Sequence, residues 1–76
     1  MIEIELKEPI KFGSETISKL VFRKPKAKDF RDLKMPLSVG ELLDLAGKLS
    51  AQPKPVIDEL GVEDTKTILG VVGDFL

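Results

Sequence analysis

The chain has 76 residues and contains neither cysteine nor histidine, which narrows what it can fold into. Disulfides cannot form, and a structural zinc site lacks the thiolate or imidazole ligands that zinc prefers. A chain of this length forms one domain at most and buries only about 60% of the surface that its unfolded form exposes. We therefore expect association, as a homo-oligomer or with a partner, to add to its stability.

The absence of histidine also limits catalysis. Neither a Ser–His nor a Cys–His nucleophile can be assembled, and the commonest general base near neutral pH is missing. The sequence has no glycine-rich loop that would hold a phosphate, and its carboxylates are scattered at positions typical of a solvent-exposed surface. We expect no catalytic residues, no cofactor and no metal ion, and hence a non-enzymatic role.

Hydropathy places the protein in the compartment where it is made. No apolar run approaches the roughly 20 residues that span a bilayer. The first residues, 1–5, alternate charged and apolar side chains and lack the hydrophobic region of a signal peptide. The expectation is a cytoplasmic protein with no membrane contact.

Residues 1–24 have the pattern of an antiparallel β-hairpin. Apolar side chains alternate with charged ones along the first strand, at Ile2, Ile4 and Leu6. Pro9 lacks an N–H group, so it predicts an edge position or a bulge. Gly13 marks the turn, because glycine adopts positive φ at little cost. A second strand is expected over residues 16–23.

The helical part, residues 26–76, begins with a short helix over roughly 26–34. Asp29 lies in its first turn, where a carboxylate meets unpaired N–H groups and the positive end of the helix dipole. Pro36 ends this helix or the turn that follows it.

A longer helix starts at the capping box formed by Ser38 and Glu41. Pro55 then opens a helix of one or two turns, and a final helix is expected over residues 63–75. The fold class is therefore α+β: a single domain, residues 1–76, with an N-terminal antiparallel hairpin followed by three to four short helices.

Charge divides the chain unevenly. Residues 1–34 hold nine basic and six acidic side chains, a net charge of +3. Residues 35–76 hold three basic and seven acidic side chains, a net charge of −4. The basic stretch 23–28, with Arg31 and Lys34, could bind phosphates or an acidic protein surface, or could simply be a solvated face.

The helix–break–helix pattern over residues 42–60 raises a DNA-binding alternative, a small helix-turn-helix-like regulatory module. Its second helix, residues 56–60, contains two acidic residues and no Arg, Asn or Gln to read base edges. Phosphate repels such a helix. Only Phe30 could stack on a base near the basic stretch, so we expect no nucleic-acid partner.

The order of these elements resembles a known family. The most diagnostic positions are Arg23, Pro25, Ala27, Asp29 and Leu33. The opening hairpin, the leucine-rich helix ending at residue 50 and the closing helix fit the same pattern. The chain is similar to the short tail assembly chaperones of Mu-like and related contractile-tailed phages. It departs from their pattern at Lys26, where a capping residue is expected, and at Gly61, where an acidic residue commonly opens the last helix.

This resemblance implies a function. Such proteins are made from phage or prophage genes in the host cytoplasm, are absent from the finished virion, and keep the long tape measure protein soluble until tail tube subunits polymerise around it. In many phages a programmed frameshift adds a C-terminal extension to some copies. A structural tail component is the remaining alternative, which differs in being present in the virion.

The partner-binding surface is predicted from pattern alone. Apolar residues of the helical part would form an open groove for an amphipathic helix, and two lysines would add charge contacts. The alternative for the apolar residues is that they fill an ordinary core. The positions are Leu42, Leu45, Leu49, Val72, Phe75, Lys24 and Lys28.

Overall fold

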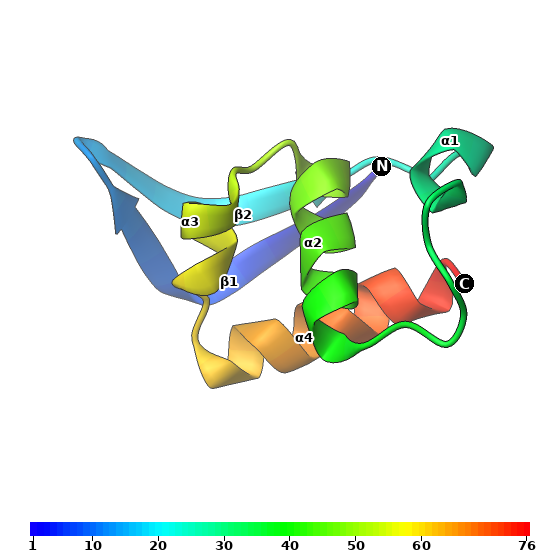
Figure 1. Cartoon of the computed structure of the whole chain (residues 1–76). Helices are drawn as coiled ribbons and strands as arrows, with labels where there is room; N and C mark the ends of the chain where they lie inside the picture. Colours follow the sequence, from blue (N-terminus) through cyan, green and yellow to red (C-terminus); the bar gives the residue numbers. More distant parts are fainter.

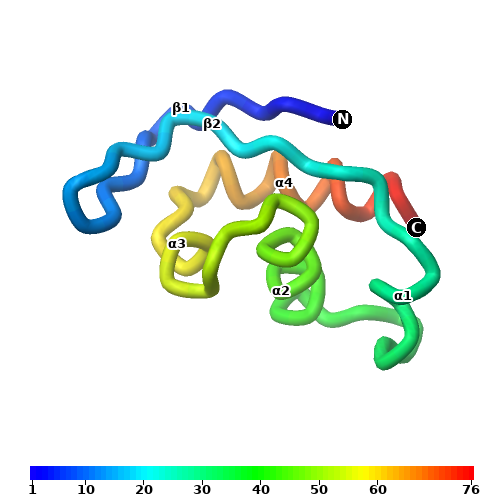
Figure 2. The backbone as a smooth tube through the Cα atoms, turned by 90° about the horizontal axis from the view of Figure 1, so that it is seen from above, coloured from blue at the N-terminus to red at the C-terminus, as the bar shows by residue number.

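The structure, a computed structural model describing residues 1–76, is a β-hairpin with four helices packed on one side of it (Figures 1 and 2). The elements in chain order are β1 (Ile2–Phe12), β2 (Glu15–Phe22), α1 (Ala27–Phe30), α2 (Val39–Ser50), α3 (Lys54–Asp58) and α4 (Val62–Asp74). The molecule is elongated, with extents of 35 × 21 × 20 Å. The hairpin turn lies at one end and α1 at the other. The predicted α+β class and the order of hairpin and helices are confirmed.

The pairing of the two strands is interrupted around Pro9, as the sequence predicted. Strand pairing is regular from Ile2 opposite Phe22 to Glu5 opposite Lys19, and resumes only at Ile10. The register shift lies between Glu5 and Ile10, around the residue that cannot donate to the ladder. At the turn, Gly13 has φ +64°, the left-handed conformation that glycine adopts without strain.

The bulge in β1 is tied to the last helix. The N–H groups of Lys7 and Glu8 donate to the two carboxylate oxygens of Asp64, at 2.9 and 3.0 Å. Asp64 lies in the first turn of α4 and is 3% exposed. Outside it, the Lys7 ammonium donates to Glu63 at 2.9 Å, a pair exposed to solvent. The Asp64 carboxylate therefore joins the first turn of α4 to the bulge of β1.

The side chain of Glu8 explains why position 61, where the family pattern has an acidic residue, is a glycine. This glycine precedes α4, and a Cβ atom built on it would lie 2.6 Å from Oε2 of Glu8. The missing side chain leaves room for the Glu8 carboxylate, which brings an acidic group to the start of α4 from β1. Negative charge there interacts favourably with the helix dipole.

The core lies between the inner face of the hairpin and α2, α3 and α4. Phe22 and Leu20 enter it from β2, and Val72 enters it from α4, each at most 1% exposed. The complete cluster is Leu6, Ile10, Leu20, Phe22, Leu45, Ala46, Leu49, Val56, Ile57, Ile68 and Val72. Every element except α1 contributes to this apolar cluster.

Helix boundaries follow local chemistry. At the start of α2, Ser38 Oγ accepts the N–H of Glu41 at 3.2 Å, and the Glu41 carboxylate accepts the N–H of Ser38 at 3.1 Å. The capping box is therefore confirmed. The first helix is a single turn, Ala27–Phe30, rather than the expected span to about residue 34. A helix this short depends on packing, and Phe30, which is half-buried, is the side chain of α1 that packs against the apolar core.

Ala51, which ends α2, adopts the left-handed conformation with φ +56°. This conformation costs an L-residue about 1–2 kcal/mol, whereas glycine adopts it freely. Ala51→Gly is therefore expected to raise the free energy of unfolding by up to about 1 kcal/mol in urea titration. Ala46→Gly, in the regular interior of the same helix, is expected to lower it by about 1 kcal/mol or more. A loss of stability in both variants would contradict this assignment.

Candidate partner-binding surface

Arg23 and Asp29, two residues of the family-like pattern, form an ion pair in which Asp29 is buried and Arg23 is half-buried. The guanidinium of Arg23 donates to the two carboxylate oxygens of Asp29 at 2.8 and 2.9 Å. Asp29 also accepts the N–H of Lys26 at 2.7 Å, which supplies the cap that the Lys26 side chain cannot. The Arg23 hydrogen bonds, followed by the Lys26 N–H, hold the pKa of Asp29 well below its usual range.

This ion pair fixes the segment between β2 and α2. The N–H of Arg23 donates to the carbonyl of Leu49 at 3.1 Å, which joins the end of β2 to the last turn of α2. The other residues of the pattern are placed around it: Pro25 is half-buried, Ala27 is exposed in the first turn of α1, and Leu33 packs against the core. We therefore read Arg23 and Asp29 as positioning residues.

The basic stretch becomes smaller and better defined once Arg23 is assigned to Asp29. Three ion pairs form in the molecule, Lys7–Glu63, Lys19–Glu3 and Arg23–Asp29. None involves the five remaining basic residues of the segment, all of which are exposed: Lys24, Lys26, Lys28, Arg31 and Lys34. We call residues 24–34 the basic segment. The predicted contact residues Lys24 and Lys28 both lie in it.

The predicted apolar groove is not open. Leu45, Leu49 and Val72 are 3%, 2% and 0% exposed, so they belong to the core, and their prediction as groove-lining residues is wrong in this conformation. The reason is that α2 packs against both β2 and α4, which covers its apolar stripe. Leu42 and Phe75 are half-buried at the edge of the core and keep part of their surface open.

In the helical part, the large apolar side chains that are exposed lie at or just outside the ends of helices. Val39 in the first turn of α2 is 58% exposed, and Leu76, just after α4, is 50% exposed. Val62 begins α4, and Met35 lies in the loop before α2; both are also exposed. Helical spacing selects the central stripe of each helix, which in a chain this small is the core, and Met35, Val39 and Val62 lie outside that stripe.

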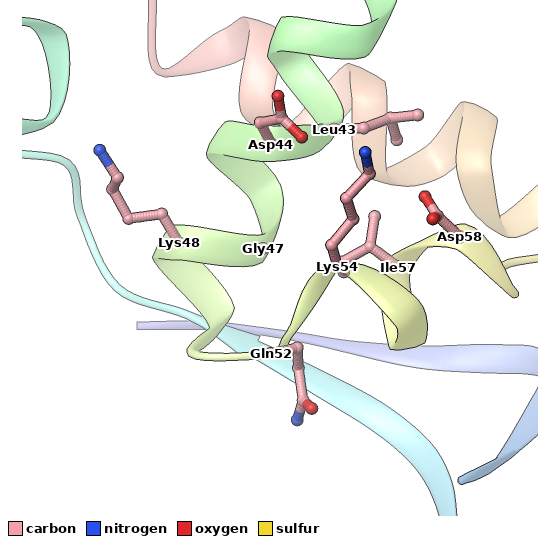
Figure 3. A pocket seen from close by; sticks show the side chains of 8 residues that line it. All are labelled: Leu43, Asp44, Gly47, Lys48, Gln52, Lys54, Ile57 and Asp58. Atoms are coloured by element: carbon pink, nitrogen blue, oxygen red, sulfur yellow. The ribbon is translucent and has the colours of Figure 1, made fainter. Parts of the chain in front are cut away.

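Two small cavities flank α2. The larger, about 140 Å³, lies between α2 and α3 (Figure 3). Asp44 and Lys48 reach it from α2, and Lys54 and Asp58 from α3, with Lys48 pointing away from the α3 pair. The smaller, about 80 Å³, lies under α1, where Leu33 and Leu45 share its lining. Charges of both signs line each cavity, and no nucleophile is paired with a base in either.

The geometry bears on metal binding, on membrane crossing and on DNA binding. No group of His, Cys, Asp or Glu side chains is placed to hold a metal ion. None of the helices combines the length and the apolar character needed to cross a membrane. The helix that would read DNA in the alternative interpretation, α3, has only five residues and is too short to follow a major groove.

The hairpin, its helical cover and an exposed basic segment at one end define a small α+β module. The model of the family described as phage tail assembly chaperone proteins, E, or 41 or 14, matches residues 3–76. The chain belongs to this family, and the resemblance drawn from its residues is confirmed. The family role is that of a chaperone in phage tail assembly, with proteins as partners. Neither the curated proteins nor the solved structures gave a match.

Proposed function

We propose that this chain binds the tape measure protein of its phage and keeps it soluble in the host cytoplasm until the tail tube forms around it. The family match over residues 3–76 carries the proposal. A tape measure protein is long and exposes apolar helical faces before assembly, so it requires reversible cover. In this role the chain acts without catalysis and is left out of the finished virion.

The proposed contact surface combines apolar and basic side chains. Leu42 and Phe75 keep part of their surface open, and each has a more exposed apolar neighbour, Val39 or Leu76. Lys24 and Lys28 add positive charge. Each contact of this size is weak, but many chaperone copies on one long partner give high avidity, and tube subunits can still displace them one by one.

Co-expression with the tape measure protein of the same phage tests the proposal. The soluble fraction is separated by size-exclusion chromatography with and without this chain. We expect the tape measure protein to be soluble and to co-elute only when the chain is present. Precipitation in both cases would refute the proposal. A structural tail component, the alternative, would be detected in purified virions by mass spectrometry.

Two exposed apolar residues test the contact surface itself. The double substitution Val39→Asp and Leu76→Asp is expected to weaken capture of the tape measure protein about tenfold or more, because charge is placed where apolar contact is proposed. The matched control, Phe12→Asp and Val62→Asp, changes the net charge equally at other exposed apolar positions. Circular dichroism confirms that each variant is folded. Equal loss of capture in the two variants would contradict the proposed surface.

A further inference from the structure

The basic segment concentrates positive charge that the fold does not use. Its five basic side chains, Lys24, Lys26, Lys28, Arg31 and Lys34, are exposed, and none of them forms an ion pair. Like charges this close in sequence repel one another, which opposes the compact state. A segment with this arrangement gains free energy when a partner brings negative charge to it.

Asp29 lies within the basic segment but does not neutralise these five charges. This carboxylate is 3% exposed, and its oxygens are occupied by the Arg23 guanidinium and the Lys26 N–H, so it faces away from solvent. Asp32 is the one remaining acidic residue of the segment. The exposed charge of residues 24–34 is therefore +4, five basic side chains against Asp32.

The segment also has a fixed place on the molecule. The Arg23–Asp29 pair and the hydrogen bond from Arg23 to the Leu49 carbonyl hold it to the body of the protein. It forms the end of the molecule opposite the hairpin turn, where α1 stands apart from the other helices (Figures 1 and 2). Its positive charges are thus presented at one end of the molecule. The helical residues that follow it, 35–76, carry a net charge of −4.

We propose that the basic segment is a docking site for an acidic stretch of a protein partner. The proposal rests on the chaperone function above, in which that partner is the tape measure protein, and it adds the chemistry that the partner must present: a run of Asp or Glu beside its apolar face. Charge contacts at such a rim guide association and fix orientation.

The structure favours an acidic protein over a nucleic acid. Phe30, the only ring in the segment, is half-buried and packs against the core, so it offers no stacking platform. Helix α1 is a single turn and cannot lie in a groove as a recognition helix.

Charge reversal with a matched control tests the docking site. The triple variant Lys24→Glu, Lys28→Glu and Arg31→Glu is compared with Lys11→Glu, Lys54→Glu and Lys66→Glu. All six side chains are exposed, and each variant changes the net charge from −1 to −7 through three reversals of two charges each. The variants are co-expressed with the tape measure protein. Purified proteins are also titrated, by fluorescence anisotropy, against a labelled Glu-rich helical peptide and a single-stranded oligonucleotide of equal charge.

The first variant is expected to lose affinity for the acidic peptide about tenfold or more, because three weak attractions become repulsions. The control variant is expected to stay within about threefold of the unmodified chain. Binding of the unmodified chain to the peptide should weaken between about 0.1 M and about 1 M salt, where the Debye length falls from about 10 Å to about 3 Å.

The outcomes separate this docking site from the chaperone function. Peptide binding that is equal in the two variants would overturn the site, as would tighter binding of the oligonucleotide than of the peptide. If the unmodified chain binds the peptide but fails to hold the tape measure protein in solution, the docking site stands and the proposed function falls. If both triple variants hold the tape measure protein equally well, the function stands and the site falls. Self-association of the unmodified chain that the first variant abolishes would assign the site to a second copy and overturn the proposal.

Discussion

Phe22→Ala is expected to lower the free energy of unfolding by about 3–5 kcal/mol, the usual cost of removing a buried phenylalanine side chain. Phe22, at the end of β2, is the largest of the fully buried side chains. A domain of 76 residues has a total stability of about 4–11 kcal/mol. The variant should therefore lie at the edge of unfolding at room temperature, as urea titration followed by circular dichroism would show.

Phe12→Ala provides the matched control, because it removes the same atoms from the other end of the hairpin. Phe12 is 43% exposed, so less apolar surface returns to water when its ring is removed. We expect this substitution to lower stability by about 1 kcal/mol or less. If the two variants lost equal stability, the assignment of Phe22 to the core and Phe12 to the surface would be wrong.

Acid is expected to destabilise the protein through Asp29 and Asp64. The ordinary pKa of each carboxyl is 3.8, and in the fold hydrogen bonds lower it: for Asp29 those from Arg23 come first, and for Asp64 those from the N–H groups of Lys7 and Glu8. A lowered folded-state pKa stabilises the protein in full above the ordinary value, and this contribution is lost as the pH falls from there through the folded-state pKa. Stability should thus be constant near neutrality and should decline below about pH 4.

The variants Asp64→Asn and Asp29→Asn separate the two contributions. Asparagine keeps the shape of the side chain but offers one oxygen in place of two, so Asp64→Asn leaves one strand N–H without its partner. This costs about 1–3 kcal/mol at neutral pH. The stability that is lost between pH 5 and pH 3 should shrink by up to about 1 kcal/mol, the most that one carboxyl can contribute over that interval. Asp32→Asn and Asp74→Asn, both at exposed positions, are the controls. If the stability of the Asp64→Asn variant declined below pH 4 as steeply as that of the unmodified chain, the proposed role of Asp64 would be contradicted.

The sequence was informative where the cause of a structure is local. The capping box of Ser38 and Glu41, the interruption at Pro9 and the turn at Gly13 each depend on a few adjacent residues, and all three are present. Period-two alternation likewise predicted the hairpin. Such features need no knowledge of how distant segments meet.

The candidate site could be predicted only in part, because burial is decided by distant neighbours. Leu45, Leu49 and Val72 have the spacing of an apolar stripe, but spacing alone does not distinguish a covered stripe from an open one. Nor does the sequence show that Asp29 pairs with Arg23, which leaves the rest of the basic segment free. Lys24 and Lys28 were identified by local charge density and are exposed.

The link between the bulge of β1 and Asp64 has a consequence for how the chain folds. It joins residues 57 positions apart, so the loop that it closes contains most of the molecule. The entropy of closing such a loop must be overcome before its hydrogen bonds form. Until α4 is in place, the two N–H groups of the bulge can bond only to water. The inner face of the hairpin is also not yet covered by α4. The order of synthesis therefore does not give the order of folding: the strand made first is completed by the helix made last, and the domain is expected to fold as one cooperative unit.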